Sequence, residues 1–565
     1  MKKFNFLGVL IVLSTVAFGQ TACDFWYVSP TGTGIDGTPT APVDFEYALS
    51  NVTPARNHIR VLGGTYTYTD KVALVSDVVI EGGYQISGSD WVLSSNVSTN
   101  FVINPPLEVV NAGGTDVGHY IGFEAVGLSN FVLRNLNISV QSAGASGTTS
   151  DRGNSIYGVY LEGCSDYTFS RVVVNTGNAS DGLDGADGAD GLIGVGGDPG
   201  SAGNCDGCFF PWCNSGSGAP GGAGGLGGGG TAAGSAGTGV NGGGGGKGGN
   251  GGREGNNSGQ SGQTGGGVVG SAAATTGGGA AGGGGDPGGD GSNGSNGVSG
   301  ADGANGSTSP AGVAASGFFI PGSIADAGAN GIAGKGGRGG GGGGGQGCSL
   351  CDDGPGNAGG GAGGGGQAGT GGIGGTGGGS AYGIFAWSNG ANADVIDSDL
   401  APGAAGSGGQ GGAGGDGANG GQGDNGATTC SSEIGEGGDG GNGGNGGNGG
   451  DGADGADGVS TSIEVDGTAA NVAGTSIPAN YNPVTVLQNQ GCTNSEILVT
   501  KNGGSFDLGA MGGAVLVNDI DPTTSSYTVG ASSVAVYYST LGIQDVVISG
   551  VNYNDYVDVV TTRPL

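Results

Sequence analysis

The sequence predicts an all-β protein, in which a parallel β-helix carries glycine-rich extended-helix insertions and is followed by a β-sandwich-like domain, with no α-helical core. Three observations lead to this prediction. Short β-rich runs recur before residue 176, glycine supplies 148 of the 565 residues and gathers between residues 177 and 460, and the chain turns β-rich and glycine-poor again after Pro478. An average globular composition shows none of these shifts.

The N-terminus has the order of a signal peptide. Lys2 and Lys3 precede an apolar run over residues 6–13, and small residues follow up to Gly19. This order predicts a signal peptide over residues 1–19, cleaved between Gly19 and Gln20. The apolar run is far shorter than the roughly 20 residues that span a bilayer. We therefore expect a secreted, extracellular or cell-surface protein without a membrane span.

The net charge argues against two classes of partner. The chain carries 47 Asp and Glu against 14 Lys and Arg, a net charge of −33, and loss of Lys2 and Lys3 with the signal peptide makes it −35. Such a charge argues against binding to nucleic acid or anionic membranes. The same charge leaves calcium binding as a weak possibility. The alternative explanation is that dispersed Asp residues keep a glycine-rich surface soluble. No other cofactor is expected.

An internal repeat supports the β-helix. Residues 121–139 recur 36 positions later at 157–175, and again at 382–400 beyond two hundred glycine-rich residues. In each copy inward residues alternate, pass a corner and alternate again, as the two short strands of a solenoid rung require. A fourth copy at 462–466 is only suggestive. The predicted inward positions are Phe131, Leu133, Leu136, Ile138; Tyr167, Phe169, Val172, Val174; and Ala393, Val395, Ser398, Leu400.

The start of this region resembles the opening of pectate-lyase-like β-helices. The residues that carry the resemblance are Trp26-Tyr-Val-Ser-Pro30 and Ile59-Arg-Val-Leu-Gly-Gly-Thr-Tyr66. It covers residues 25–176 and 380–400 and implies a right-handed parallel β-helix. It says little about activity, because that family includes lyases, hydrolases, phage tailspikes and adhesins.

The glycine-rich region has a period of three. Glycine occupies every third position without a miss over 182–203, 408–426 and 437–458, and a second glycine often follows the first. Three residues per turn is the repeat of a polyproline-type helix, and two bare faces let such helices pack side by side. The alternative is disorder, because ordering a glycine-rich chain costs about 1–2 kcal/mol per residue. The region resembles glycine-rich domains of mycobacterial PGRS proteins, phage adhesins and small glycine-helix antifreeze proteins.

These patterns divide the chain after the signal peptide. We expect the N-terminal part of the β-helix at 20–176, a first glycine-rich insertion with cysteine loops at 177–379, a β-helix rung at 380–400, a second insertion at 401–460, the end of the β-helix or a linker at 461–478, and a β-rich C-terminal domain, complete or truncated, at 479–565.

Cysteines and aromatic residues interrupt the glycine runs. In a secreted chain, cysteines favour disulfides, and the odd total of nine leaves at least one unpaired within the chain. Two C-x-x-C pairs also suit zinc. The aromatic residues either pack on the β-helix and bundle ends or form an exposed contact patch. The candidate disulfide cysteines are Cys205, Cys208, Cys213, Cys348, Cys351 and Cys430; the candidate contact patch is Phe209, Phe210, Trp212, Phe318 and Phe319.

Catalytic and calcium motifs are incomplete. The polygalacturonase patterns survive only as Asn175-Thr-Gly177 and Gly118-His119-Tyr120, and we expect His119 and His58, the two histidines, to lie at turns or strand edges. Calcium-binding RTX nonapeptides are matched at 411–416 and 449–454, but not in tandem. No catalytic, cofactor-binding or metal-binding residue is therefore predicted.

The function expected is structural: a secreted or cell-surface adhesin or extracellular matrix scaffold that presents loops at the ends of glycine helices to a surface carbohydrate or a protein. Two alternatives stay open, a polysaccharide-active lyase or hydrolase and an ice-binding protein. The sequence leaves the oligomeric state undetermined.

Overall fold

The computed structural model describes residues 25–466, except 89, 95, 145–151, 205–216, 231–239, 254–258, 267–277, 348–353, 391–392 and 397, and strands between residues 468 and 559. The predicted signal peptide lies outside these residues. None of the helices in the described part is long and apolar enough to cross a membrane.

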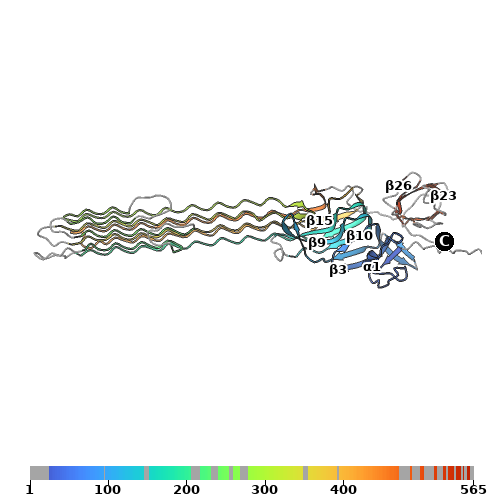
Figure 1. The fold of residues 1–565 in the computed structure, drawn as a ribbon, viewed down its shortest axis with the longest axis horizontal. Coiled ribbons are helices and arrows are strands. Elements are labelled where there is room, and N and C mark those ends of the chain that lie inside the picture. The colour runs from blue at the N-terminus through green and yellow to red at the C-terminus, as the bar shows by residue number, and fades with distance from the viewer. Residues whose placement is uncertain are drawn as a thin grey trace, which may run out of the picture.

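Two stacked, mostly parallel sheets form the β-helix (Figure 1). The first sheet runs β1 (Phe25–Val28), β2 (His58–Leu62), β5 (Val78–Ser87), β10 (Ser129–Val140), β12 (Ser165–Thr176) and β16 (Ala393–Ile396), with β3 (Gly64–Tyr68), β6 (Asp90–Leu93), β7 (Thr99–Ile103) and β17 (Asp399–Ala401) beside it. The second runs β4 (Val72–Ala73), β9 (Thr115–Val126), β11 (Ser155–Glu162), β15 (Ala381–Trp387), β18 (Ser460–Val465) and β19 (Thr468–Ala469), with β8 (Glu108–Ala112) on β9. The one helix among the described residues, α1 (Phe45–Ser50), packs near β1.

Strand register confirms the internal repeat. Phe131 of β10 pairs with Tyr167 of β12, and Tyr167 pairs in turn with Ala393 of β16. Beyond the corner, Val174 pairs with Leu400 of β17. The β-helix therefore resumes in register after the long insertion. The suggestive fourth copy is also a rung, because β18 pairs in parallel with β15.

The core lies between the two sheets, where the inward residues of successive rungs stack. Phe131, Leu133, Leu136 and Ile138 are all fully buried, and burying each such side chain contributes about 1.5–3 kcal/mol. At the corner of this rung Asn135 takes a left-handed φ of 53°, which Asn tolerates better than most residues.

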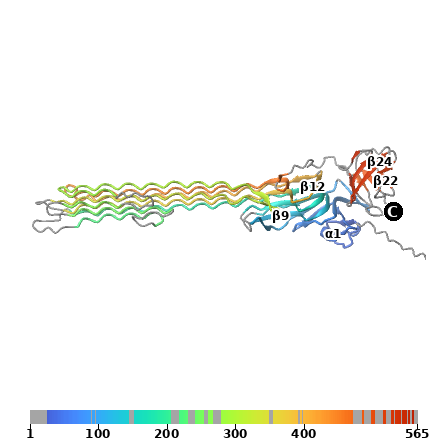
Figure 2. The ribbon, with the colours of Figure 1, turned by 45° about the horizontal axis from the view of Figure 1, so that its top comes forward.

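Both glycine-rich insertions leave the β-helix at one corner. The first connects β12 of the first sheet to β15 of the second, and the second connects β17 to β18. In the preceding rung, residues 141–154 close the same corner between β10 and β11. The insertions run away from the β-helix together as a long rod (Figures 1 and 2).

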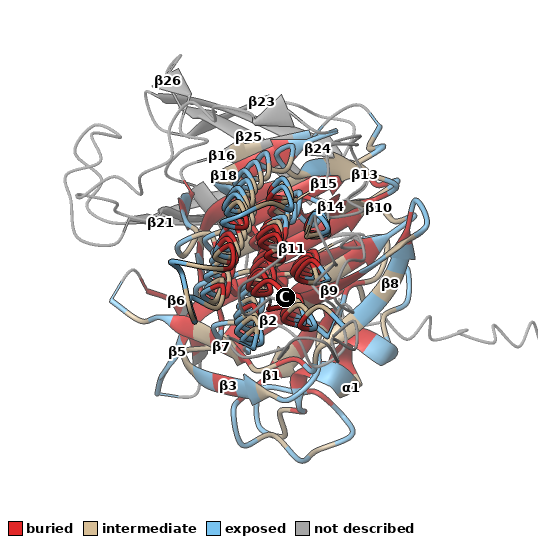
Figure 3. Cartoon of the chain, turned by 90° about the vertical axis from the view of Figure 1, so that its left-hand side faces the viewer, coloured by how far each residue is buried: buried red, intermediate tan, exposed pale blue. Residues whose placement is uncertain are grey.

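The described glycine segments pack side by side in a bundle, as the period of three predicts. Segment 354–380 lies at the centre and exchanges backbone hydrogen bonds with six surrounding segments, which also bond to one another around the ring. Seen from the free end of the rod, buried turns lie in the middle of the bundle (Figure 3). In order, the ring consists of 177–204, 217–230, 240–253, 322–347, 435–459 and 402–427.

The number of neighbours explains where glycine is densest. A Cβ added at Gly361 would lie 1.9 Å from the carbonyl oxygen of Ala223, and one at Gly363 would lie 1.9 Å from that of Gly421. Segment 322–347 becomes a second centre in its distal half, where 259–266, 278–285 and 287–309 also bond to it or pack on it. Residues 339–345 of that half are all glycine, so a helix surrounded on every side has no side chains.

The remaining described strands form one hairpin and two further sheets. A hairpin of β13 (Val313–Ala315) and β14 (Phe318–Ile320) interrupts the glycine segments. After residue 480 the strands form two four-stranded sheets, and their arrangement as a sandwich stays a prediction. One sheet holds β20 (Val484–Val486), β21 (Ile497–Lys501), β22 (Ala514–Val517) and β27 (Val557–Val559); the other holds β23 (Ser526–Val529), β24 (Ser532–Ser539), β25 (Gly542–Ile548) and β26 (Val551–Asn552).

Candidate functional site

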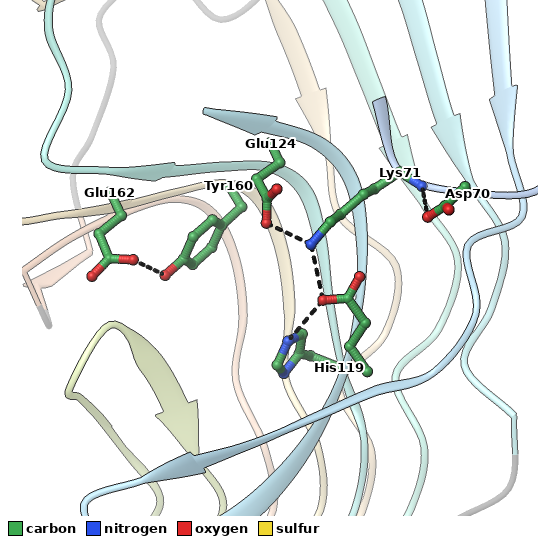
Figure 4. Close-up of polar contacts among 7 residues, drawn as sticks. Asp70, Lys71, His119, Glu124, Tyr160 and Glu162 are labelled. Atoms are coloured by element: carbon green, nitrogen blue, oxygen red, sulfur yellow. Dashed lines mark hydrogen bonds and ion pairs between the residues drawn. The ribbon is translucent and has the colours of Figure 1, made fainter. Parts of the chain in front are cut away.

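A lysine bridges two carboxylates on the outer side of the second sheet. Lys71, just before β4, places its Nζ 2.7 Å from Oε1 of Glu124 on β9 and 3.0 Å from Oε2 of Glu108 on β8 (Figure 4). Nε2 of His119, also on β9, lies 3.9 Å from the same Glu108 oxygen. Nearby, the Tyr160 hydroxyl donates to Glu162 at 3.0 Å. This cluster joins the beginning of β4 to β8 and β9.

The protonation states in this cluster follow from burial and charge. Burial alone would lower the pKa of Lys71, but hydrogen bonds to Glu124 and Glu108 and their charges outweigh it, so the pKa is raised. Burial, with a smaller contribution from the Lys71 charge, lowers the pKa of His119 to about 4. At neutral pH Lys71 is charged and His119 is neutral.

These states fit a structural bridge better than proton transfer. A general base or acid works best with a pKa near the operating pH, whereas the pKa of Lys71 lies above that range and that of His119 below it. His119 is also 1% exposed. Sequence reasoning singled out only His119, in the incomplete pattern Gly118-His119-Tyr120. It missed Lys71, Glu108 and Glu124, because they come from separate segments and belong to no recognisable motif.

Both histidines belong to strands: His58 is the first residue of β2, whereas His119 lies inside β9, which corrects the expectation of a turn or strand edge for His119. His58 on β2 is buried beside Glu81, with 3.4 Å between its Nε2 and Oε2 of the carboxylate. Tyr84 donates to the same oxygen at 2.6 Å. Burial lowers the pKa of His58 despite the nearby carboxylate. The buried side chains of His58, Glu81 and Tyr84 lie together on the outer side of the first sheet.

The β13–β14 hairpin fastens the rod to the β-helix. The ring of Phe318 stacks on His119 and Tyr160, with ring centroids 4.6 and 5.1 Å apart. Phe319 is buried, and its backbone N–H donates to the Tyr157 hydroxyl at 2.9 Å. Phe318 and Phe319 therefore pack on the β-helix, and Phe319 offers no exposed surface to a partner. The other members of the candidate contact patch, Phe209, Phe210 and Trp212, lie outside the described residues.

The cysteine-bearing segments begin and end close together at the far end of the rod. Asn357 accepts the backbone N–H of Gly203 and donates to the carbonyl oxygen of Thr429. Cys430 is disulfide-bonded, and its partner lies outside the described residues. Cys164 is free and buried in the β-helix. The pairing of the candidate set stays a prediction, because Cys205, Cys208, Cys213, Cys348 and Cys351 lie outside the described residues.

Rows of Asp and Asn side chains hold one face of the rod together. Asp184 accepts the backbone N–H of Gln410 at 2.7 Å, and Asp454 accepts that of Gly411 at 2.9 Å. These side chains replace the carbonyl oxygens that a further helix would supply. The acceptors repeat every third residue: Asp181, Asp184, Asp187 and Asp190 toward 402–427; Asp439, Asn442, Asn445, Asn448, Asp451, Asp454 and Asp457 toward the same segment; and Asp290, Asn293, Asn296, Ser299, Asp302 and Asn305 toward 435–459.

The RTX-like aspartates belong to this face. Asp454 accepts the hydrogen bond just described, and the backbone N–H of Asp416 donates to Asp190. Among the described residues no group of three or more His, Cys, Asp or Glu side chains could hold a metal ion. From the sequence we interpreted dispersed Asp residues as keeping the glycine-rich surface soluble and did not predict their hydrogen bonds to a neighbouring segment.

Comparisons with family models, curated proteins and solved structures give no match for this chain. The function must therefore be argued from the geometry. The most extensive polar arrangement among the described residues is the face of the rod formed by these rows of Asp and Asn acceptors, the ladder face. Among the described residues, the distal ends of the glycine segments lie farthest from the β-helix (Figure 1).

Proposed function

We propose that this chain is a secreted or cell-surface structural protein, an adhesin or matrix scaffold, in which the β-helix is the base and the glycine bundle is a projecting rod. One observation carries the proposal: parallel backbone hydrogen bonds join 177–204 to 402–427, such as Gly185 to Gln410 at 2.7 Å, and continue the stacking of the rungs into the rod.

Several attachments support a rigid rod rather than a tethered one. The chain passes between β-helix and rod after β12, before β15, after β17 and before β18. The β13–β14 hairpin adds a packed contact, and Arg152 donates to the carbonyl oxygen of Pro321 at 2.6 Å. Multiple crossings and a buried hairpin restrict hinge motion at the junction.

The far end of the rod is ordered around two buried side chains. Ile434 is fully buried and lies where a Cβ on Gly203 or Gly354 would meet it. Asn357 is also fully buried and donates to the carbonyl oxygens of Thr429 and Gly435. A fixed end supports presentation of the turns to a surface carbohydrate or a protein.

The test compares the mature chain with a rodless variant. Residues 177–380 and 402–459 are each replaced by the short connection 141–154, which closes the same corner in the preceding rung. Circular dichroism and thermal unfolding check that the β-helix still folds. Binding is measured to immobilised extracellular polysaccharides and matrix proteins, and by adhesion of beads coated with each protein.

We expect the mature chain to bind at least one of these surfaces and the folded rodless variant to lose that binding. Equal binding by both proteins would place the contact on the β-helix and contradict the proposal. Turnover of a polysaccharide would instead favour the enzyme, and thermal hysteresis would favour ice binding.

A further inference from the structure

The rod has an acidic side without a basic residue. Segments 177–204, 287–309, 402–427 and 435–459 contain fourteen Asp and Glu and no Lys or Arg. Their carboxylates form exposed rows in the half nearer the β-helix, because Asp184 and Asp454 both bond to the part of 402–427 that follows β17. Each of these side chains uses Oδ1 for the ladder, which leaves its charge facing solvent.

Four basic residues lie on other segments of the rod. Lys247 and Arg253 belong to 240–253, and Lys335 and Arg338 belong to 322–347. Lys247, Arg253 and Lys335 are exposed and Arg338 is half-buried. None of the four forms an ion pair with a described residue, since the ion pairs of the described part all lie in the β-helix.

The packing order separates Lys247 and Arg253 from the acidic segments, whereas Lys335 and Arg338 lie on a segment that bonds directly to 287–309 and 435–459. Around the central segment, 240–253 lies opposite 402–427, and 322–347 lies opposite 177–204. The described residues of 217–230, 240–253, 259–266 and 278–285 include no acid, and 322–347 has only Asp326. The rod therefore presents an acidic face on one side and unpaired bases on others.

The spacing of the charges is also complementary. Lys335 and Arg338 are three residues apart, as are successive aspartates such as Asp184 and Asp187. In a helix with three residues per turn, both spacings correspond to about 9 Å along the axis. Bases on one rod can therefore meet aspartates on another at successive turns.

We propose that the rod associates side by side with the rod of a second copy of this chain, the basic side of one against the acidic face of the other. The contact is heterologous, so each copy keeps a free acidic face and a free basic side, and association continues into arrays. Repulsion from the net charge is screened beyond about 10 Å at 0.1 M salt, whereas direct pairs are screened less. This inference bears on the scaffold role, but its test requires no adhesion.

Two variants test the proposal. The base-neutral variant carries Lys247→Gln, Arg253→Gln, Lys335→Gln and Arg338→Gln. The acid-neutral variant carries Asp184→Asn, Asp187→Asn, Asp451→Asn and Asp454→Asn, and it keeps the ladder because Asn serves as the acceptor at 442, 445 and 448. Circular dichroism and thermal unfolding check both folds.

Sedimentation velocity measures association of the mature proteins. We expect the unaltered protein to form concentration-dependent oligomers at about 0.05 M NaCl that dissociate at about 0.5 M, and either variant alone to associate about tenfold more weakly. An equimolar mixture of the two variants should form dimers that contain one copy of each, because the base-neutral variant keeps the acidic face and the acid-neutral variant keeps the bases.

Opposite results would overturn the proposal. If general repulsion dominated, the acid-neutral variant would associate as well as or better than the unaltered protein. A mixture that failed to recover pairs, or an unaltered protein that stayed monomeric at low salt, would also contradict it. Binding of the bases to an added acidic polysaccharide without any self-association would identify a different partner.

Discussion

Oδ1 of Asp184 accepts the backbone N–H of Gln410 at 2.7 Å, although 226 positions separate the two residues in the chain. The same separation relates Val174 of β12 to its strand partner Leu400 of β17. The register set by the β-helix thus continues into the rod. Side-chain acceptors and strand pairs belong to one arrangement of stacked turns.

This relationship predicts how the aspartate row responds to substitution. Asp181, Asp184 and Asp187 each accept a backbone N–H of 402–427. Changing all three to Ala removes those acceptors, and we expect a loss of about 0.5–1.5 kcal/mol for each. The same three changes to Asn should leave stability nearly unchanged. Thermal unfolding by circular dichroism measures both, and equal melting temperatures for the two triple variants would refute a role in the ladder.

Close packing predicts a second difference, between two glycines. Gly361 lies in the central segment, where an added Cβ would approach the carbonyl oxygen of Ala223 to 1.9 Å, whereas a Cβ at Gly283 would meet nothing within 4 Å. We expect Gly361→Ala to destabilise the rod by about 1–3 kcal/mol or more and Gly283→Ala to have little effect. Limited proteolysis and thermal unfolding compare the two variants. If both variants were as stable and as protease-resistant as the unaltered protein, the packing of six segments around 354–380 would be contradicted.

The strand register could be predicted from the sequence, but the neighbours in the rod could not. Phe131 and Tyr167 stand out because inward positions repeat around a corner. Ala393 pairs with Tyr167 as the repeat predicts, but it is exposed rather than inward. Glycine triplets look alike in every segment and do not say which segments touch. The one local signal is density: Gly339–Gly345 leave no side chain on any face, which marks a segment surrounded on all sides.

The lysine cluster lay beyond sequence reasoning for a different reason. Lys71, Glu108 and Glu124 come together because β4 and β8 both pair with β9. The internal repeat does not include β4 or β8, so nothing in the spacing of these residues indicates that they meet. Folding of neighbouring strands, rather than a local motif, builds this group.

One position in the central segment interrupts a series of side-chain acceptors. Thr376 accepts the N–H of Leu183 at 2.7 Å, and Thr370 accepts that of Ala189 at 2.6 Å. Ile373 stands midway and cannot accept, so the exposed N–H of Ala186 has no acceptor among the described residues.

We expect Ile373→Thr to stabilise the rod, because a hydroxyl there would accept the N–H of Ala186. The gain should be about 0.5–1.5 kcal/mol, and Ile373 is 53% exposed, so little buried apolar contact is lost. Ile373→Val is the control, since it keeps the β-branched shape without an acceptor. Thermal unfolding compares the three proteins, and a melting temperature for Ile373→Thr at or below that of Ile373→Val would refute the missing bond.

The last prediction concerns pH and the joint between β-helix and rod. Burial lowers the pKa of His119 from 6.5 to about 4, so between these values the unfolded chain binds more protons than the folded one. The free energy of unfolding therefore rises with pH across this window. Below pH 4 the folded protein carries the full destabilisation that comes from burying this histidine. A pKa shift of this size corresponds to a change of about 3 kcal/mol in the free energy of unfolding.

The variant His119→Phe should reduce this dependence. Neither ring nitrogen of His119 has a hydrogen-bond partner among the described residues, and its ring stacks on Phe318, so an apolar ring retains the packing. We expect the variant to match the unaltered protein at pH 7 and to be more stable near pH 4. Unfolding at both values measures this, and NMR of the two histidines assigns the titration. A His119 pKa at or above 6.5 would contradict the burial that holds the hairpin on the β-helix.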